Sequence, residues 1–253
     1  MRPVALVTGA RRGIGRACAL ALARAGWDIA GTDLVLDEAA EDARAAIEAA
    51  GARCLFLRHD VAAVETHAAL VTRIEAALGP ISVLVNNAGR GAVARGDLLD
   101  LTPQNFDAVM SVNLRGTAFL SQAVARAMLS REATHPRAIV TITSVSAALV
   151  SADRVEYCVS KAALSMFSQA LCVRLAPEGI GVFEVRPGIV ATDMTAPVAE
   201  RYEARIREGL VPARRWGTPE DVAAAVVAVC DGRLGFATGS VIQADGGLSI
   251  GRL

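Results

Sequence analysis

Short apolar runs alternate along the chain with longer, alanine-rich segments. The runs lie at residues 4–7, 28–32, 54–57, 82–85, 138–143, 181–185 and 240–243. Each run is almost continuously hydrophobic, as is typical of parallel strands that are buried on both faces. Strands that alternate with helices in this way predict right-handed crossovers and an α/β fold: a doubly wound parallel sheet with helices on both faces, in a single domain over residues 1–253.

Glycine, threonine and proline mark the ends of the expected helices. Gly26, Gly51 and Gly79 each follow an alanine-rich segment, at the position of a helix C-cap. Thr102 and Pro103 have the pattern of an N-cap followed by a proline in the first turn. These signals predict short connections between strands and helices, without a linker or a repeat.

Residues 188–218 are the least regular part of the pattern. The segment combines proline, arginine and a short amphipathic run, VAERYEARI. A long irregular excursion within a compact domain is often a lid or a substrate loop, and we expect one here. An ordinary surface helix would give the same pattern.

Composition argues against several classes of partner. Hydrophobic residues make up 53% of the chain and the mean hydropathy is +0.40, but no apolar run reaches the roughly eighteen residues of a membrane span. The N-terminal sequence MRPVALVTGA lacks the apolar segment and cleavage site of a signal peptide. A net charge of zero and a pI of about 6.8 disfavour nucleic acid or an anionic membrane as a partner. We therefore expect a cytoplasmic protein that acts on a small molecule.

Cysteine and histidine give no sign of a metal site. The five cysteines form no C-x-x-C pair, and the three histidines are scattered. Free thiols in a reducing compartment fit this pattern best. We expect no bound metal and no Ser-His-Asp triad.

The first expected strand ends in TGARRGIG, residues 8–15. Its glycines, at positions 9, 13 and 15, lie where the chain must turn sharply from strand to helix. A phosphate could approach the backbone amides at the start of that helix, where the helix dipole favours negative charge. The spacing is G-x3-G-x-G rather than G-x-G-x-x-G, and a tight turn without a ligand would also use these glycines.

The second expected strand ends in Asp33. A carboxylate there can accept hydrogen bonds from the adenosine ribose of a dinucleotide, and it repels a 2′-phosphate. Two unit charges about 4 Å apart interact by roughly 4 kcal/mol at an effective dielectric constant of about 20, which suffices for strong discrimination. Arg12 is the opposing signal, because its guanidinium could pair with a 2′-phosphate. We expect NAD rather than NADP, since Asp33 is fixed at a strand end whereas Arg12 can turn into solvent.

Two further polar segments follow expected strands. Asp60 comes after the third strand, and NNAG, residues 86–89, comes after the fourth. Open parallel sheets bind ligands at the carboxyl ends of their strands, so both segments are placed to meet a cofactor. Asn86 could also serve to tie neighbouring strands together.

The segment YCVSK, residues 157–161, contains the only lysine of the chain. Tyr157 and Lys161 are four residues apart on an expected helix and share one face, and Ser144 lies thirteen residues before Tyr157. A tyrosine hydroxyl ionises at about pH 10 and is a poor base at neutral pH. A nearby ammonium lowers that pKa, and a lysine is compact enough to reach a ribose hydroxyl as well. We expect an acid–base site here; a surface lysine is the alternative.

Taken in order along the chain, TGARRGIG, NNAG, Asn113 in SVNLRG, Ser144, YCVSK and RPGIVATDM resemble the motifs of the short-chain dehydrogenase/reductase family. The resemblance spans essentially the whole chain. It implies a Rossmann-type sheet of about seven strands that binds NAD(P) at its carboxyl edge. It also implies an oxidoreductase that transfers a hydride between the nicotinamide and a secondary alcohol or ketone carbon.

The resemblance gives each catalytic residue a role. Tyr157 would be the general acid/base, and Ser144 would polarise the substrate oxygen. Lys161 would lower the pKa of Tyr157 and hold the nicotinamide ribose. Asn113, within a long helix, would anchor a water that links Lys161 to solvent. We expect the residues that contact substrate to be Ser144, Ser146, Arg154 and Tyr157.

The resemblance also implies the cofactor contacts. The segment from Pro187 to Thr192 would cradle the nicotinamide, and Asp60 and Val61 would flank the adenine. The full set expected to bind the cofactor is Gly9, Arg11, Arg12, Gly13, Ile14, Gly15, Asp33, Asp60, Val61, Asn87, Ala88, Gly89, Tyr157, Lys161, Pro187, Gly188, Val190 and Thr192.

Among the relatives, the sequence resembles those labelled 3-oxoacyl-(acyl-carrier-protein) reductases, but two features point to another substrate. Such reductases usually use NADPH, which Asp33 disfavours, and they dock an acidic carrier protein on basic residues, where this chain has Glu178. We expect an NAD(H)-dependent enzyme for a small or medium secondary alcohol, hydroxy acid or sugar-like substrate. An NADPH-dependent 3-oxoacyl reductase is the alternative, and a non-catalytic cofactor-sensing protein is the third candidate.

The resemblance further implies a homotetramer, because the family is generally tetrameric. The expected helices over 103–130 and 157–176 contain enough Ala, Leu and Met to pack between subunits.

Overall fold

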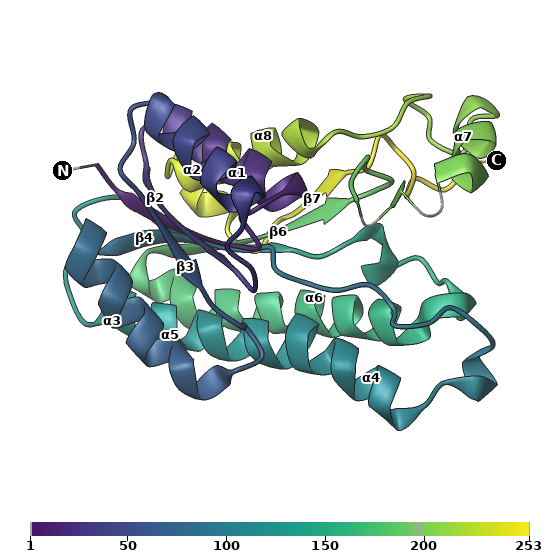
Figure 1. Ribbon diagram of the computed structural model, residues 1–253, viewed down its shortest axis with the longest axis horizontal. Coiled ribbons are helices and arrows are strands. Elements are labelled where there is room, and N and C mark those ends of the chain that lie inside the picture. Colours follow the sequence, from purple (N-terminus) through teal and green to yellow (C-terminus); the bar gives the residue numbers. More distant parts are fainter. Residues whose placement is uncertain (1, 194, 197–198, 253) are drawn as a thin grey trace.

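The parallel sheet expected from the apolar runs is confirmed by the computed structural model, which describes residues 2–193, 195–196 and 199–252 (Figure 1). Its strands follow the order β3-β2-β1-β4-β5-β6-β7, and every neighbouring pair is parallel. The central strands β1 and β4 are buried along their whole length, which explains their unbroken hydrophobic sequences. The strands are β1 (Val4–Thr8), β2 (Asp28–Asp33), β3 (Cys54–Arg58), β4 (Ile81–Asn86), β5 (Arg137–Ile142), β6 (Ile180–Pro187) and β7 (Val241–Ala244).

Helices cover both faces of this sheet (Figure 1). One layer consists of α1 (Gly13–Arg24), α2 (Glu38–Ala49) and α8 (Pro219–Cys230), and the opposite layer of α3 (His67–Leu78), α4 (Pro103–Met110), α5 (Thr117–Leu129) and α6 (Val155–Leu175). Leu22 and Val226 are fully buried in the first layer, and Ile74 and Leu120 in the second. Within the described residues, no helix has the length and apolar character needed to cross a bilayer.

The expected helix ends are also present. Gly26, Gly51 and Gly79 have φ values of 105°, 80° and 104°, a conformation that favours glycine where a helix stops. The Thr102 side chain accepts a hydrogen bond from the Asn105 backbone N–H, and α4 begins at Pro103. The sequence therefore placed these boundaries to within a residue or two.

The long helix expected over 103–130 is not uniform. Ser111–Gly116 forms a π-helical segment between α4 and α5, and Asn113 lies inside it. A Cβ atom on Gly116 would fall 2.3 Å from the carbonyl oxygen of Val61, so the wide turn brings backbone against backbone here. Nothing in the apolar periodicity signals this change.

The irregular segment 188–218 begins beside the sheet and then departs from it. Val190 forms an isolated parallel bridge with Gly217, which closes the excursion at its base. The segment contains α7 (Ala199–Arg207) at the end of the molecule near the C-terminus (Figure 1). Residues 194, 197 and 198 of the expected lid lie outside the described part of the chain.

Candidate active site

The carboxyl ends of β1 and β4 are tied together by side-chain hydrogen bonds. The Thr8 hydroxyl accepts from the backbone N–H groups of Asn87 and Ala88 at 3.0 and 2.9 Å. The Asn87 amide donates to the carbonyl oxygens of Thr8 and Gly9 at 2.8 and 3.2 Å. These hydrogen bonds hold the NNAG segment and the glycine-rich turn together at the carboxyl edge of the sheet, the edge where open parallel sheets bind ligands.

The glycine-rich turn leaves a cradle that side chains would fill. A Cβ atom on Gly15 would lie 2.0 Å from the Gly9 carbonyl oxygen, and Gly9 itself has φ 66°. Helix α1 starts at Gly13, and its N-cap residue, Arg12, makes no side-chain capping bond. The first amides of α1 thus have no side-chain cap at Arg12, an arrangement that fits a dinucleotide phosphate.

Asp33 is the last residue of β2, as expected. Arg11 lies against it, a contact that the sequence analysis did not predict. The Arg11 Nε atom is 3.7 Å from Asp33 Oδ1, and Arg11 Nη1 is 2.5 Å from Asp37 Oδ2. Arg12 instead turns outward and pairs with Asp193 at 2.7 Å, with both side chains more than half exposed. Both arginines that could neutralise a 2′-phosphate are therefore paired with carboxylates.

Ser144, Tyr157 and Lys161 meet where β5 leads into α6. Ser144 caps a short helical turn, with its hydroxyl accepting from the Ser146 N–H at 3.1 Å, and Tyr157 and Ser144 are hydrogen-bonded through their side chains. The Lys161 Nζ atom is 5.7 Å from the centre of the Tyr157 ring and donates to the Ile142 carbonyl at 3.0 Å. All three residues are buried.

The expected lowering of the Tyr157 pKa is wrong for this structure. Burial raises the pKa of Tyr157, while the hydrogen bond from Ser144 and the charge of Arg154 oppose that rise. Lys161 is itself buried, which lowers its own pKa to about 8, and the Glu184 carboxylate opposes this shift. Sequence reasoning treated the ammonium as an unscreened charge and left out the desolvation of both groups.

Asn113 clamps the loop that follows NNAG onto α6. Its Oδ1 atom accepts from the Arg90 N–H at 2.8 Å, and its Nδ2 atom donates to the Arg90 carbonyl and the Ser160 hydroxyl, each at 3.0 Å. A Cβ atom on Gly89 would lie 3.3 Å from Asn113 Oδ1 and 3.7 Å from Lys161 Nζ. Both amide hydrogens are engaged, so a water bound by this side chain would have only its carbonyl oxygen to contact.

The segment after β6 faces the glycine-rich turn. Gly188 packs so closely that a Cβ atom would lie 2.8 Å from the Cα atom of Asp245. Farther on, Thr192 Cγ2 is 3.6 Å from where a Cβ atom on Gly13 would be. Pro187 and Val190 are buried on the path between them. The structure thus brings the two expected cofactor segments together across the edge of the sheet.

Asp60 and Val61 lie beyond β3, at the outer end of the same edge. Asp60 is exposed, and its Oδ1 atom accepts from the Ala62 N–H at 2.9 Å. Val61 is buried, with its carbonyl against Gly116. Their position is compatible with a contact to adenine, while their own interactions are those of a rigid turn.

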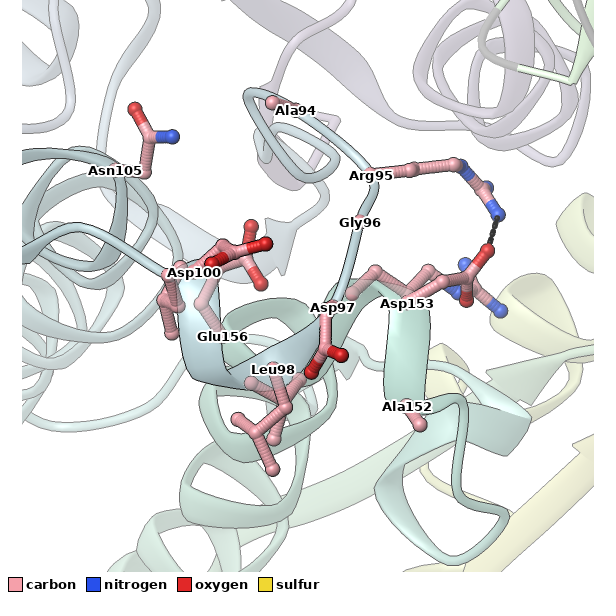
Figure 2. A pocket seen from close by; sticks show the side chains of 13 residues that line it. Ala94, Arg95, Gly96, Asp97, Leu98, Asp100, Asn105, Ala152, Asp153 and Glu156 are labelled. Carbon is pink, nitrogen blue, oxygen red and sulfur yellow. Dashed lines mark hydrogen bonds and ion pairs between the residues drawn. The ribbon is translucent and has the colours of Figure 1, made fainter.

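A cavity of about 270 Å³ lies at the start of α6, where Arg154, Val155 and Glu156 line it (Figure 2). The Arg154 guanidinium lies 5.2 Å from the centre of the Tyr157 ring and donates to the Ser146 hydroxyl at 3.1 Å. Figure 2 shows Arg95 directed at Asp153, with the two side chains 3.2 Å apart. The acidic residues that line the cavity are Asp97, Asp100, Asp153 and Glu156.

Sequence reasoning missed three features of this site. It did not identify Thr8 as the residue that joins β1 to NNAG, or Asp37 as the partner of Arg11. It also overlooked Glu184 and Arg186, although two charged residues within the buried strand GVFEVRP are a visible signal. The partners of Thr8 and Arg11 belong to other elements, so spacing along the chain carries no information about those contacts.

Known proteins resemble this chain along nearly its whole length. A family model described as enoyl-(acyl carrier protein) reductase matches residues 9–249. A 3-oxoacyl-[acyl-carrier protein] reductase from Brucella melitensis, solved in complex with NAD, is 56% identical, with a TM-score of 0.97 and coverage of 100% of this chain and 99% of that chain. A 2-dehydro-3-deoxy-D-gluconate 5-dehydrogenase from Dickeya dadantii is 32% identical over 96% of this chain and 94% of the relative. An L-rhamnose 1-dehydrogenase (NAD(P)(+)) from Sphingomonas is 31% identical, covering 97% and 95%.

Proposed function

This chain belongs to the short-chain dehydrogenase/reductase family, and we propose that it is an NAD(H)-dependent enzyme in which Tyr157 exchanges a proton with a secondary alcohol or ketone. The family relationship makes it an oxidoreductase acting on CH–OH or keto groups with a nicotinamide cofactor. The observation that carries the catalytic assignment is the buried group of Ser144, Tyr157 and Lys161 at the carboxyl edge of the sheet.

When bound, the nicotinamide supplies a hydride in the reductive direction and accepts one in the oxidative direction. Tyr157 gives its proton to the ketone oxygen as the alcohol forms, and takes it back in oxidation. Burial raises the pKa of this phenol, which favours the protonated form that acts as the acid in the reductive direction. Ser144 donates a hydrogen bond to the same oxygen, and Lys161 holds the nicotinamide ribose.

The remaining catalytic and cofactor residues support this group. Asn113 fixes the loop after NNAG against α6, and the glycine-rich turn with Arg11, Arg12 and Ile14 receives the phosphates at the start of α1. Asp60 and Val61 would contact the adenine. The segment Pro187–Thr192 would cover the nicotinamide.

The proposed preference for NAD follows from Asp33 and its surroundings. Asp33 is placed at the end of β2 to accept hydrogen bonds from the adenosine ribose. A 2′-phosphate would have to displace Asp33 or Asp37 from Arg11, or Asp193 from Arg12. The relative from Brucella melitensis was solved with NAD, which agrees with this preference.

The cavity at the start of α6 supports a neutral, hydroxyl-bearing substrate. Its four lining carboxylates outnumber the two arginines, Arg95 and Arg154. Arg95 is paired with Asp153, and Arg154 is engaged with Ser146. Carboxylate acceptors suit the hydroxyl groups of a polyol or sugar and repel an anionic substrate. We place Ser146 and Arg154 among the substrate contacts, with Ser144 and Tyr157.

A 3-oxoacyl thioester reductase is the second candidate. It is favoured by the relative from Brucella melitensis, a 3-oxoacyl-[acyl-carrier protein] reductase that is 56% identical to this chain. One basic residue that could dock an acidic carrier, Arg131, already pairs with Glu75, and Arg174 pairs with Glu178.

The expected assembly is a homotetramer in the cytoplasm, with residues 188–218 as a lid. The helices proposed to lie between subunits expose apolar side chains: Phe119 is 46%, Met166 is 65% and Val173 is 79% exposed. A second copy of the same helices would cover them. Sedimentation at several protein concentrations tests this assembly.

The function is tested with a panel of polyols, sugar acids, simple secondary alcohols and 3-oxoacyl thioesters, each with NAD(H) and NADP(H), followed by nicotinamide absorbance. We expect turnover of a neutral hydroxyl compound with NAD, and its loss in Tyr157→Phe with cofactor binding retained. Tyr202→Phe, at the chain's other tyrosine, is the matched control. Turnover that survives Tyr157→Phe would contradict the assignment of Tyr157.

A further inference from the structure

Two charged residues lie inside β6 among buried apolar neighbours. Glu184 is 3% exposed, and the Arg186 side chain is 14% exposed. Arg186 Nε donates to Glu184 Oε1 at 2.6 Å. A buried charge is costly unless it is paired and hydrogen-bonded, so this pair requires its surroundings to be arranged around it.

The Glu184 carboxylate joins three elements through its two oxygens. Thr143, which follows β5, donates its hydroxyl to Oε1 at 2.6 Å. Ser165, on α6, donates its hydroxyl to Oε2 at 2.8 Å. Arg186 Nη2 in turn donates to the Ser165 hydroxyl at 2.7 Å. Charge-assisted hydrogen bonds of this kind are strong and directional, so the network fixes β5, β6 and α6 relative to one another.

This network lies directly behind the proposed acid–base group. Thr143 is adjacent to Ser144 in the chain, and Ser165 follows Lys161 by one turn of α6 on the same helix face. Lys161 itself donates to the carbonyl of Ile142, the residue before Thr143. The Glu184 carboxylate is therefore hydrogen-bonded to Thr143, which adjoins Ser144 in the chain, and to Ser165, which lies one helical turn after Lys161.

We propose that Glu184, balanced by Arg186, is the countercharge of Lys161 and a positioning residue for the acid–base group; this rests on the function proposed above for Lys161. Burial works against the Lys161 ammonium and lowers its pKa to about 8, whereas the Glu184 charge favours the ammonium. Arg186 limits that effect because it places a positive charge against the same carboxylate. The net charge of the pair thus sets how firmly Lys161 holds its proton.

Other charged groups around the site are less well placed for this role. Arg154 stacks on the ring of Tyr157, and Glu178 pairs with Arg174 at the far end of α6. Arg90, Asp107 and Arg115 extend from neighbouring elements and are exposed, so solvent screens them. The charged side chains on and around α6, besides Glu184 and Arg186, are Arg90, Asp107, Arg115, Asp153, Arg154, Glu156, Arg174 and Glu178.

The single lysine makes a direct test possible. Protein grown with isotope-labelled lysine gives one side-chain NMR signal, and its pH titration reports Lys161 in the protein without added cofactor or substrate. Glu184→Gln leaves Arg186 unbalanced, so the midpoint should fall by about one pH unit. Arg186→Gln leaves Glu184 unbalanced, with Thr143 and Ser165 still donating to it, so the midpoint should rise by a similar amount. The double variant Glu184→Gln/Arg186→Gln should return towards the original value.

Opposite shifts separate the charge effect from a structural one. Thr143→Val removes a hydrogen bond to Glu184 without changing any charge, and it should leave the midpoint in place. Each single variant tests the predicted direction of its own midpoint shift. If one variant fails to fold, the other still decides. Midpoints that stay fixed, or that move the same way in both single variants, would overturn the proposal.

Kinetics connects the titration to the reaction. For alcohol oxidation, the pH at which kcat/KM reaches half its plateau should move down in Glu184→Gln and up in Arg186→Gln. If the unmutated enzyme turns over none of the panel above, the proposed function fails while the titration still judges the role of Glu184. If turnover is present and neither profile moves, the countercharge role of Glu184 is wrong and the proposed function stands.

Discussion

Replacing Lys161 with methionine should make the cofactor-free protein more stable at neutral pH while abolishing its activity. Lys161 is 5% exposed, and burial lowers its pKa from 10.5 to about 8. A shift of that size corresponds to about 3 kcal/mol of unfavourable interaction between the native state and the ammonium. Methionine carries no charge but leaves the Ile142 carbonyl without its hydrogen bond, which costs about 1–2 kcal/mol. The expected net gain in the free energy of unfolding is about 1–2 kcal/mol.

The pH dependence of this gain is the sharper signature. Between pH 8 and 10.5 the native chain has released the Lys161 proton while the unfolded chain still holds it. The unfolded state then binds more protons, so the stability contributed by this residue in the unmutated protein rises with pH through that window. Lys161→Met lacks the rise. Its advantage should therefore shrink by about 3 kcal/mol across the window and change sign.

Urea denaturation of both proteins across this pH range, without cofactor and at one protein concentration, measures the difference. The same pair compared in a Tyr157→Phe background shows whether the neighbouring tyrosine contributes to the titration. A stability difference that stays constant from neutral pH to pH 10.5 would mean that Lys161 titrates alike in the native and unfolded states, contrary to this prediction.

Three further substitutions test individual contacts. Asp37→Asn keeps the N-cap of α2 but releases Arg11 from one carboxylate. The Kd for NADPH, measured by nicotinamide fluorescence, should fall roughly threefold, while the Kd for NADH changes little. An unchanged Kd for NADPH would count against a role of the Arg11–Asp37 pair in cofactor selection. Gly15→Ala places a Cβ atom 2.0 Å from the Gly9 carbonyl and should abolish cofactor binding, whereas Gly91→Ala points into open space and should not; retained binding in Gly15→Ala would contradict the cradle. Thr218→Ala breaks the reciprocal cap of α8 and should lower the free energy of unfolding by about 1 kcal/mol, with Thr218→Ser as the control; equal losses in both would contradict it.

The strands could be predicted from sequence because burial on both faces leaves a direct signature. Every apolar run became a strand, since a parallel strand between two helical layers has no polar face. The meeting of Tyr157, Lys161 and Ser144 could also be anticipated, because helical spacing and the end of a strand fix their positions. Strand burial and helical spacing are local rules, and they were enough to predict these features.

Contacts between elements could not be predicted in the same way. The π-helical turn around Asn113 ends at Gly116, which packs against Val61, a residue far from it in the chain. The pairing of Arg11 with Asp37 depends on how the loop after β2 folds back. The direction of the Tyr157 pKa shift depends on how deeply the ring is buried, and burial depth is a property of the whole packed layer.

The central claim, an NAD(H)-dependent enzyme that selects its cofactor through Asp33, is tested most directly by titrating the purified protein with NADH and with NADPH. Nicotinamide fluorescence gives both dissociation constants, for the unmutated protein and for Asp33→Ala. We expect NADH to bind more tightly than NADPH, and Asp33→Ala to narrow the difference in affinity because the carboxylate proposed to accept from the ribose is gone. Tighter binding of NADPH by the unmutated protein would contradict this expectation, assign the 2′-phosphate to Arg11 or Arg12, and favour the 3-oxoacyl thioester reductase.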